Sequence, residues 1–354
     1  YDFLWVIFVR ASRWMNARWL APLNPLMDNP KITDKTLLAL DDFAPRLLET
    51  FRKDNNLYAL PMLADTNAMM CRTDIMARIG LSAPPDTFDD LLAACKKVHS
   101  PEVAGFVTHG VPAGLHWNYP VFLQGFGGDF FADPPKDMTP TLNAEPAVKS
   151  ADFLALLIRE YSPPGAATFD HPDWLPLYQM GKVAFSINAD TWLTQAMDKT
   201  KSQVHDRIRI ARVPKGPARR APQMAVHGFA VPANSRQKEA AWLLLQWSTS
   251  QEMMASVMEK QNFQGITRSS VAGSQAYKDK FTIGGGDLGA IRQEAFDTAQ
   301  IAYRVIPEFV PIGDRVGIAI QQIATNQKSA KAAMDDAQKD VVEIIKKAGY
   351  KISA

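Results

Sequence analysis

The stretch Met180-Gly-Lys-Val-Ala-Phe-Ser-Ile-Asn188 joins the two kinds of element on which the predicted fold depends. Residues 175–180 have the pattern of a short helix, and Gly181 supplies its end. Residues 183–187 are mostly apolar and rich in residues that favour strands. Helical and strand-like segments alternate in this way along almost the whole chain, so the sequence predicts an α/β fold.

The opening segment, residues 1–9, is almost continuously apolar. This pattern is typical of a strand buried on both faces, as in a parallel sheet covered by helices. A natural chain rarely begins so abruptly on a strand, so we expect further residues before Tyr1.

Local signals place other elements along the chain. Residues 57–60 and 67–72 are expected to be strands on either side of a turn at Pro61. Thr87 followed by Asp90 matches a capping box at the start of a helix. Apolar residues recur at helical spacing in two further segments, which are residues 143–161, with Asn143 as the expected cap, and residues 329–348.

Length, composition and charge exclude several classes of protein. The 354 residues exceed one ordinary core and suit two lobes. A net charge of +2 offers no concentrated basic face, so we expect no nucleic-acid partner. No run of about 18 apolar residues is present, so the sequence predicts no membrane span.

The two cysteines give little information about function. Cys71 lies in an apolar run and Cys95 on a predicted helix. This placement favours two buried free thiols, although a disulfide between them stays open.

The chain lacks the common sequence motifs of catalysis and cofactor binding. The sequence has no phosphate-binding loop, dinucleotide fingerprint, zinc-protease motif or nucleophile elbow. The six histidines never occur at metal-ligand spacing on one element, so we expect no metal and no cofactor. Glycoside hydrolysis stays open, because it needs only two carboxylates that can lie far apart in sequence.

Aromatic residues beside amides and carboxylates gather in three segments that we expect to be loops or strand ends, namely residues 117–119, 188–192 and 227–228. Aromatic rings cover the C–H faces of a sugar, while Asp, Asn and His bond its hydroxyls. Core packing is an equally good explanation for any single ring. For the three segments together, we favour a carbohydrate site.

A series of short segments, taken in order, resembles the extracellular solute-binding proteins of ABC importers, the family that includes maltose-binding protein. Within that family, residues 162–166 and 306–313 are most similar to the sugar and sugar-alcohol binders. The segments that carry the family resemblance are Asp2–Val6, Leu57–Pro61, Pro84–Phe88, Gly125–Asp129, Met180–Asn188, His227–Ser235 and Lys331–Ala337.

The resemblance implies an α/β, two-lobe, periplasmic-binding-protein-like fold with discontinuous lobes and a ligand cleft between them. The N-terminal lobe would comprise residues 1–106 and 230–280, and the C-terminal lobe residues 107–229 and 281–354. Members of this family normally reach the strand seen here after a strand, a helix and a second strand. The opening strands of the first lobe would therefore precede Tyr1.

The resemblance also implies ligand-binding positions in the first half of the family pattern. Asp65, after the Leu-Pro turn, matches an acidic acceptor of ligand hydroxyls. Arg10 follows the first strand at a polar contact position. His227 and Gly228 match the strand that crosses between the lobes, and Arg268 lies in a Gly-Ile-Thr-Arg segment that we add to the set.

Five further positions match the second lobe. His116 and Trp117 correspond to an aromatic loop. Asp190 and Trp192 follow Ile-Asn, where many relatives carry Gly-x-Trp; the Ala-Asp-Thr-Trp of this chain can shift Trp192 by one position. Asp314 stands where maltose-type relatives have an aromatic residue, a change that favours a small, hydroxyl-rich ligand.

The function that the resemblance implies is that of a carrier without catalysis. It would be monomeric, periplasmic or extracellular, with or without a lipid anchor, and would deliver a small sugar or polyol to a membrane ABC permease. One alternative is a glycoside hydrolase that uses carboxylates such as Asp65 and Asp190. A binder of peptides, polyamines or iron is the other; iron is disfavoured because Tyr119 is the only tyrosine in the aromatic segments.

Overall fold

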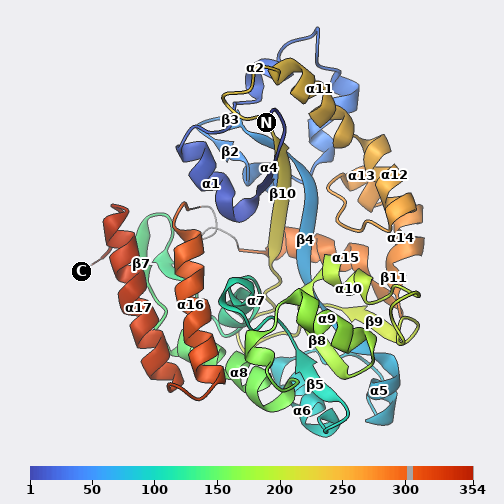
Figure 1. Cartoon of the computed structure of the whole chain (residues 1–354), viewed down its shortest axis with the longest axis vertical. Helices are drawn as coiled ribbons and strands as arrows, with labels where there is room; N and C mark the ends of the chain where they lie inside the picture. The colour runs from blue at the N-terminus through green and yellow to red at the C-terminus, as the bar shows by residue number, and fades with distance from the viewer. Residues whose placement is uncertain (301–305, 354) are drawn as a thin grey trace. The chain divides into compact units, whose positions relative to one another are not determined.

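The computed structural model describes residues 1–300 and 306–353, and its chain divides into two compact units (Figure 1). Each unit is assembled from separated stretches of the chain. The first change of unit falls at residues 65–66, earlier than the lobe boundary expected at residue 106. Unit 1 consists of Tyr1–Asp65, Met224–Phe281 and a short stretch that ends at Phe309, and unit 2 of Thr66–Gln223 and two stretches that begin at Thr282 and Val310.

Three strands form the sheet of unit 1, in the order β1-β10-β4. β1 is antiparallel to β10, with Leu4 opposite Ala230 and Ile7 opposite His227. Only the first part of β4 belongs to this unit, because the strand continues past Asp65 into unit 2. The elements of unit 1 are β1 (Leu4–Ile7), α1 (Phe8–Asn16), α2 (Asn24–Met27), α3 (Lys35–Leu38), the 3-10 turn Leu40–Asp42, α4 (Pro45–Glu49), β2 (Arg52–Lys53), β3 (Asn56–Leu57), β4 (Ala59–Arg72), β10 (Met224–Ala230), α11 (Lys238–Ser248), α12 (Gln251–Gln261), α13 (Ser269–Ala272) and α14 (Gln275–Phe281).

β1 corrects the expectation of a strand buried on both faces in a parallel sheet. It is antiparallel, and among the described strands it has β10 as its one neighbour. Val6 is fully buried, whereas Trp5 is 60% exposed. The apolar run looked longer than the strand because Phe8 already belongs to the helix α1.

The sheet of unit 2 contains the second part of β4 with three other strands. β5 and β8 are parallel, with Phe106 opposite Phe185, and β4 runs antiparallel to β8, with Asn67 opposite Ala189. The helices α6 and α8 pack on β5, and α17 packs on α8. The elements of unit 2 are α5 (Thr73–Arg78), α6 (Phe88–Val98), β5 (Ala104–Val107), α7 (Pro112–Gly125), β6 (Phe131–Asp133), β7 (Asp137–Pro140), α8 (Glu145–Tyr161), the 3-10 turn Ala166–Thr168, α9 (His171–Gln179), β8 (Val183–Ala189), α10 (Asp190–Gln195), β9 (Ile208–Ala211), β11 (Thr282–Ile283), β12 (Gly286–Asp287), α15 (Leu288–Thr298), α16 (Phe309–Ala324) and α17 (Ala330–Lys347).

Helix starts in unit 2 test the cap predictions. The capping box of α6 is confirmed: the hydroxyl of Thr87 accepts the N–H of Asp90 at 3.1 Å, and the Asp90 carboxylate accepts the N–H of Thr87 at 3.1 Å. The predicted cap of α8 was wrong. Asn143 donates instead to Asp335 at 3.0 Å, a bond to a distant helix that no local pattern indicates.

Both cysteines are free and buried, as expected from their apolar surroundings. Cys71 lies on β4 and Cys95 on α6. Burial raises the pKa of both thiols well above their ordinary value, so they stay protonated at neutral pH.

Candidate functional site

In unit 1 the structure brings Asp65 together with His227. The two residues lie on neighbouring strands, and Asp65 Oδ2 is 3.7 Å from His227 Nε2. Burial lowers the pKa of His227 to about 4, which keeps the imidazole neutral at neutral pH. A neutral imidazole has one donor and one acceptor nitrogen, so this pair can both give and accept hydrogen bonds.

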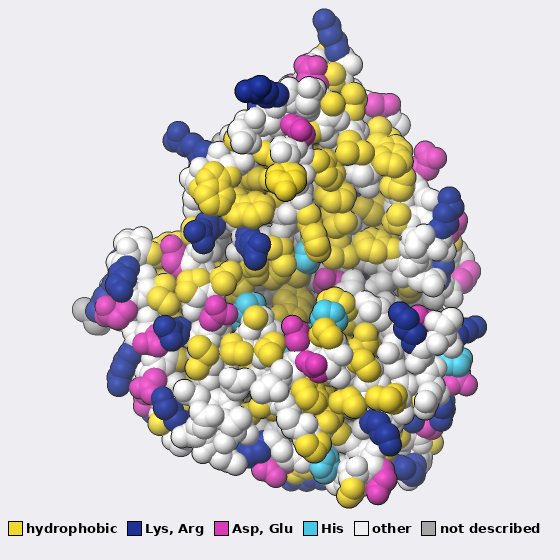
Figure 2. Space-filling model, viewed as in Figure 1, with side chains coloured by type: hydrophobic (Ala, Val, Ile, Leu, Met, Phe, Trp, Pro, Cys, Tyr) yellow, Lys and Arg dark blue, Asp and Glu magenta, His cyan; other side chains and the backbone are white. Residues whose placement is uncertain are grey.

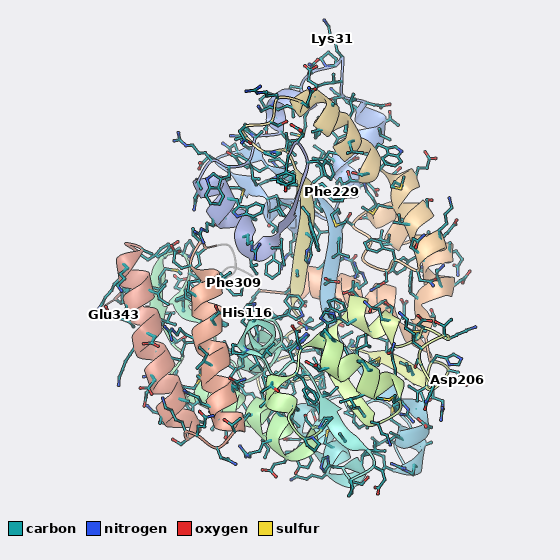
Figure 3. The ribbon with its side chains drawn as sticks, viewed as in Figure 1. Lys31, His116, Asp206, Phe229, Phe309 and Glu343 are labelled. Carbon is teal, nitrogen blue, oxygen red and sulfur yellow. The ribbon has the colours of Figure 1, made fainter. Side chains whose placement is uncertain are left out.

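The aromatic rings of Trp5 and Phe8 lie beside His227. Its ring centroid is 5.3 Å from that of Trp5 and 6.5 Å from that of Phe8, and Phe8 lies 6.3 Å from Phe309, which Figure 3 labels. Figure 2 shows hydrophobic side chains gathered over the part of unit 1 that Figure 1 labels α1, β10 and α11. Because Trp5 is 60% exposed, unit 1 offers an open aromatic surface beside a polar pair.

Trp5 and Phe8 were not among the expected site residues. They belong to the apolar opening segment, which the sequence analysis placed in a sheet core. In the structure, the antiparallel pairing of β1 with β10 places Trp5 beside His227. The sequence alone does not show which strands pair, so it could not place Trp5 beside His227.

Gly228 lies on the other side of the strand from His227, since neighbouring side chains of a strand point to opposite faces. A Cβ added there would come within 2.9 Å of Ala59 Cβ and of the Phe51 ring. The glycine therefore allows β10 to pack against Phe51. Arg10 follows β1, as expected, and is exposed on α1.

Arg268 is fully buried in unit 1 and serves its packing. Its Nε donates to the carbonyl of Thr249 at 2.6 Å and its Nη1 to that of Ala39 at 2.7 Å. The guanidinium lies 3.8 Å from the centre of the Phe43 ring, and burial lowers its pKa to about 10. These contacts tie together three segments of the unit.

In unit 2, buried amides gather at one edge of the sheet. Asn118 donates to Asn188 Oδ1 at 2.8 Å and to Thr108 Oγ1 at 2.6 Å, and it accepts from Asn67 at 3.0 Å. Thr108 follows β5, and Asn188 lies near the end of β8, so the network sits at the carboxyl ends of two parallel strands. Such ends are the usual ligand-binding edge of α/β sheets. The structure thus joins two of the three predicted segments.

The segment 117–119 lies on α7, which corrects the expectation of a loop. Tyr119 is core, with its hydroxyl 3.0 Å from the carbonyl of Ala147. Trp117 and His116 are half-buried on the same helix. The helix continues past Pro120.

His116 meets Asp314, which comes from the distant helix α16. The imidazole Nδ1 is 4.0 Å from Asp314 Oδ1. Gly313 permits this approach, because a Cβ atom at residue 313 would lie 2.8 Å from the Cβ of His116. His116 is labelled in Figure 3. Two expected site residues from separate stretches are therefore neighbours in unit 2.

Asp190 opens α10 and is completely buried. Its Oδ2 accepts from Arg292 Nη1 at 2.5 Å and from Thr66 Oγ1 at 3.1 Å. Arg292, on α15, is 2% exposed and was not among the expected residues. An arginine on an amphipathic helix looks like surface charge in a sequence, and only the fold places it against Asp190.

Trp192, the remaining expected aromatic, has its ring stacked on that of His171, with centroids 4.0 Å apart and planes 19° apart. His171 begins α9. Among residues 1–300 and 306–353, no three His, Cys, Asp or Glu side chains gather in a way that could hold a metal ion. Unit 2 therefore contains a network of buried amides, the carboxylate of Asp190 paired with Arg292, and the stacked rings of Trp192 and His171.

Comparison with known proteins identifies the class. Residues 5–255 match the family of bacterial extracellular solute-binding proteins, and the chain belongs to this family. It is 27% identical to the mannitol-binding protein of Pseudomonas aeruginosa, over 99% of this chain and 81% of that protein. Within the described residues, no helix is both long and apolar enough to cross a bilayer.

Solved structures agree with this assignment. An ABC-transporter solute-binding protein of Agrobacterium vitis S4 with bound D-mannitol superposes with a TM-score of 0.85 at 25% identity, over 99% of this chain and 86% of that one. A ribitol complex from Agrobacterium radiobacter K84 gives 0.84 at 23% identity, over 97% and 85%. The predicted α/β, two-lobe, periplasmic-binding-protein-like class is confirmed.

Proposed function

We propose that this chain is the solute-binding component of an ABC importer and that its ligand is a small polyol or sugar. The observation that carries the proposal is the agreement between the relative named for mannitol binding and the similar structure that contains D-mannitol. The chemistry of the described side chains supports it, because both units present polar groups next to aromatic rings.

The proposed ligand contacts come from both units. In unit 1 they are Asp65, His227 and the exposed ring of Trp5, and in unit 2 His116, Trp192 and Asp314. A small polyol has few carbons, so its affinity must come from well-aligned hydrogen bonds. Micromolar binding corresponds to about 8 kcal/mol. A few charge-assisted bonds of about 1.5–3 kcal/mol each reach that value.

The proposed mechanism is closure of two lobes on the ligand, followed by delivery to a membrane permease. Ligand contacts from both lobes would favour the closed state by their differential affinity. The two compact units are the natural candidates for these lobes. We propose further that the protein acts as a monomer outside the cytoplasmic membrane and releases its ligand unchanged.

A thermal-shift screen tests this function. Purified protein would be melted with D-mannitol, ribitol, maltose, an amino-acid mixture, a polyamine and ferric citrate in separate wells. A specific ligand at 100 times its dissociation constant adds about 2.7 kcal/mol of stability. We expect clear stabilisation by a polyol or sugar. Stabilisation by only the amino acids, polyamine or iron would refute the proposed ligand class.

A further inference from the structure

The stack of His171 on Trp192 carries an inference about ligand selectivity. The two rings are nearly parallel, with 19° between their planes and 4.0 Å between their centroids. Both residues are partly exposed, so they lie where a solute can reach them. The imidazole covers one face of the indole at the distance that the flat C–H face of a ring sugar would take.

The backbone at His171 is held by the start of α9. Asp170 Oδ1 accepts the N–H of His171 at 2.8 Å, and Asp173 Oδ2 accepts the N–H of Asp170 at 2.8 Å. Pro172 follows in the first turn and restricts the chain further. The imidazole thus starts from a fixed position above the indole.

A chain of polar contacts runs from Asp170, beside His171, to Asn188, four residues before Trp192. Asp170 Oδ1 lies 3.3 Å from His109 Nε2, and His109 Nδ1 lies 3.0 Å from the Asn118 amide nitrogen. Asn118 in turn donates to Asn188, near the end of β8 and just before the helix that carries Trp192. The hydrogen bond from His109 lowers the pKa of Asp170 to about 2, so this carboxylate stays charged. These contacts link the two segments that carry the stacked rings.

We propose that His171 is a specificity-determining residue that occupies the ring-stacking position on Trp192 and so favours an acyclic polyol over a pyranose. A pyranose needs a flat aromatic face for its C–H groups, and on this side of Trp192 that face is taken. An extended polyol needs hydrogen-bond partners along its edge, which an imidazole can supply. The inference rests on the proposed function, since it concerns the same ligand site.

Calorimetric titration of His171 variants tests the proposal. The wild type, His171→Ala and His171→Ser would each be titrated with D-mannitol and with methyl α-D-glucopyranoside. We expect the wild type to prefer the polyol at least tenfold. Both variants should lose most of that preference, because they open the indole to the sugar ring. Because Asp170 remains the N-cap of α9, His171→Ser gives a second, polar truncation that tests the proposal even if the alanine variant folds poorly.

Two controls separate selectivity from general damage. His171→Phe keeps a flat ring over Trp192 but removes the imidazole's hydrogen bonds, so it should still disfavour the pyranoside while binding D-mannitol more weakly than the wild type does. His205→Ala removes a histidine of the same unit whose Nδ1 contacts the carbonyl of Ser202 at 3.1 Å, and it should bind like the wild type. Circular dichroism melts would confirm that each variant is folded.

The outcomes distinguish this proposal from the proposed function. Polyol binding by the wild type with an unchanged preference in the alanine and serine variants would overturn the role of His171 and leave the function standing. A wild type that binds the pyranoside as tightly as D-mannitol would overturn it too. Binding of neither class of ligand would remove both proposals.

Discussion

His227 shows how much a single residue depends on partners that are distant in sequence. Its place on a strand was expected, but its neighbours Asp65, Trp5 and Phe8 come from two other strands and a helix. Local periodicity carries no information about which strands pair, so Trp5 could not be assigned to the site. Arg292 was missed for the same reason, because its partner Asp190 lies 102 residues away.

Titration of His227 should make stability fall in mildly acidic solution. Its pKa is about 4 in the folded protein and about 6.5 in an unfolded chain. As the pH falls, the unfolded chain therefore binds a proton at this histidine before the folded protein does. The stability contributed by the neutral imidazole is complete above pH 6.5 and is lost as the pH falls through 4. The loss should approach about 3 kcal/mol.

Urea unfolding at pH 7.5, 5.5 and 4.5, on the wild type and on His227→Gln, measures this effect. Ordinary carboxylates titrate in both proteins, so the difference between them isolates His227. We expect the wild type to lose more stability than the variant between pH 7.5 and 4.5. Parallel losses would contradict the neutral, buried state of this histidine.

Asp65→Ala should weaken polyol binding more than tenfold, because the variant removes a charged acceptor whose hydrogen bonds are worth about 1.5–3 kcal/mol. Calorimetric titration with D-mannitol measures the change. Glu49→Ala is the matched control, an exposed acidic residue on α4 of the same unit, and should bind as the wild type does. Unchanged affinity in a folded Asp65→Ala protein would remove Asp65 from the site.

At the scale of elements, the predictions succeeded where the signal is local. The α6 capping box and the strand β8 follow from residues within a few positions of each other. The prediction of a turn at Pro61 between two strands was wrong. β4 is one strand, Ala59–Arg72, with Pro61 inside it; the Pro61 carbonyl accepts Thr267 Oγ1 at 3.0 Å.

The pair of Asp190 and Arg292 holds α10 to α15, so Arg292→Met should destabilise unit 2. The two side chains are 0% and 2% exposed, and removing one partner leaves the other charge buried. We expect a loss of about 3–5 kcal/mol in urea unfolding. Arg212→Met is the control: Arg212 pairs with Glu294 from an exposed position, and its loss should cost about 1 kcal/mol or less. Equal losses in the two variants would contradict a structural role for the buried pair.

At the scale of the whole molecule, each compact unit contains stretches that are far apart in the sequence. Hydrophobic patterns describe a helix or a strand and do not show that residues 224–281 return to the unit of residues 1–65. The α/β class could be predicted from alternating elements. The two-lobe arrangement came from resemblance to a family, and the contacts around Asp190 required coordinates.

Equilibrium dialysis with labelled D-mannitol tests most directly the claim that this protein binds a polyol and leaves it intact. The bound label would be released by denaturation and compared by chromatography with the starting compound. The account predicts about one saturable ligand per chain, recovered unchanged. Recovery of a converted product, or the absence of saturable binding for D-mannitol, ribitol and maltose alike, would contradict it.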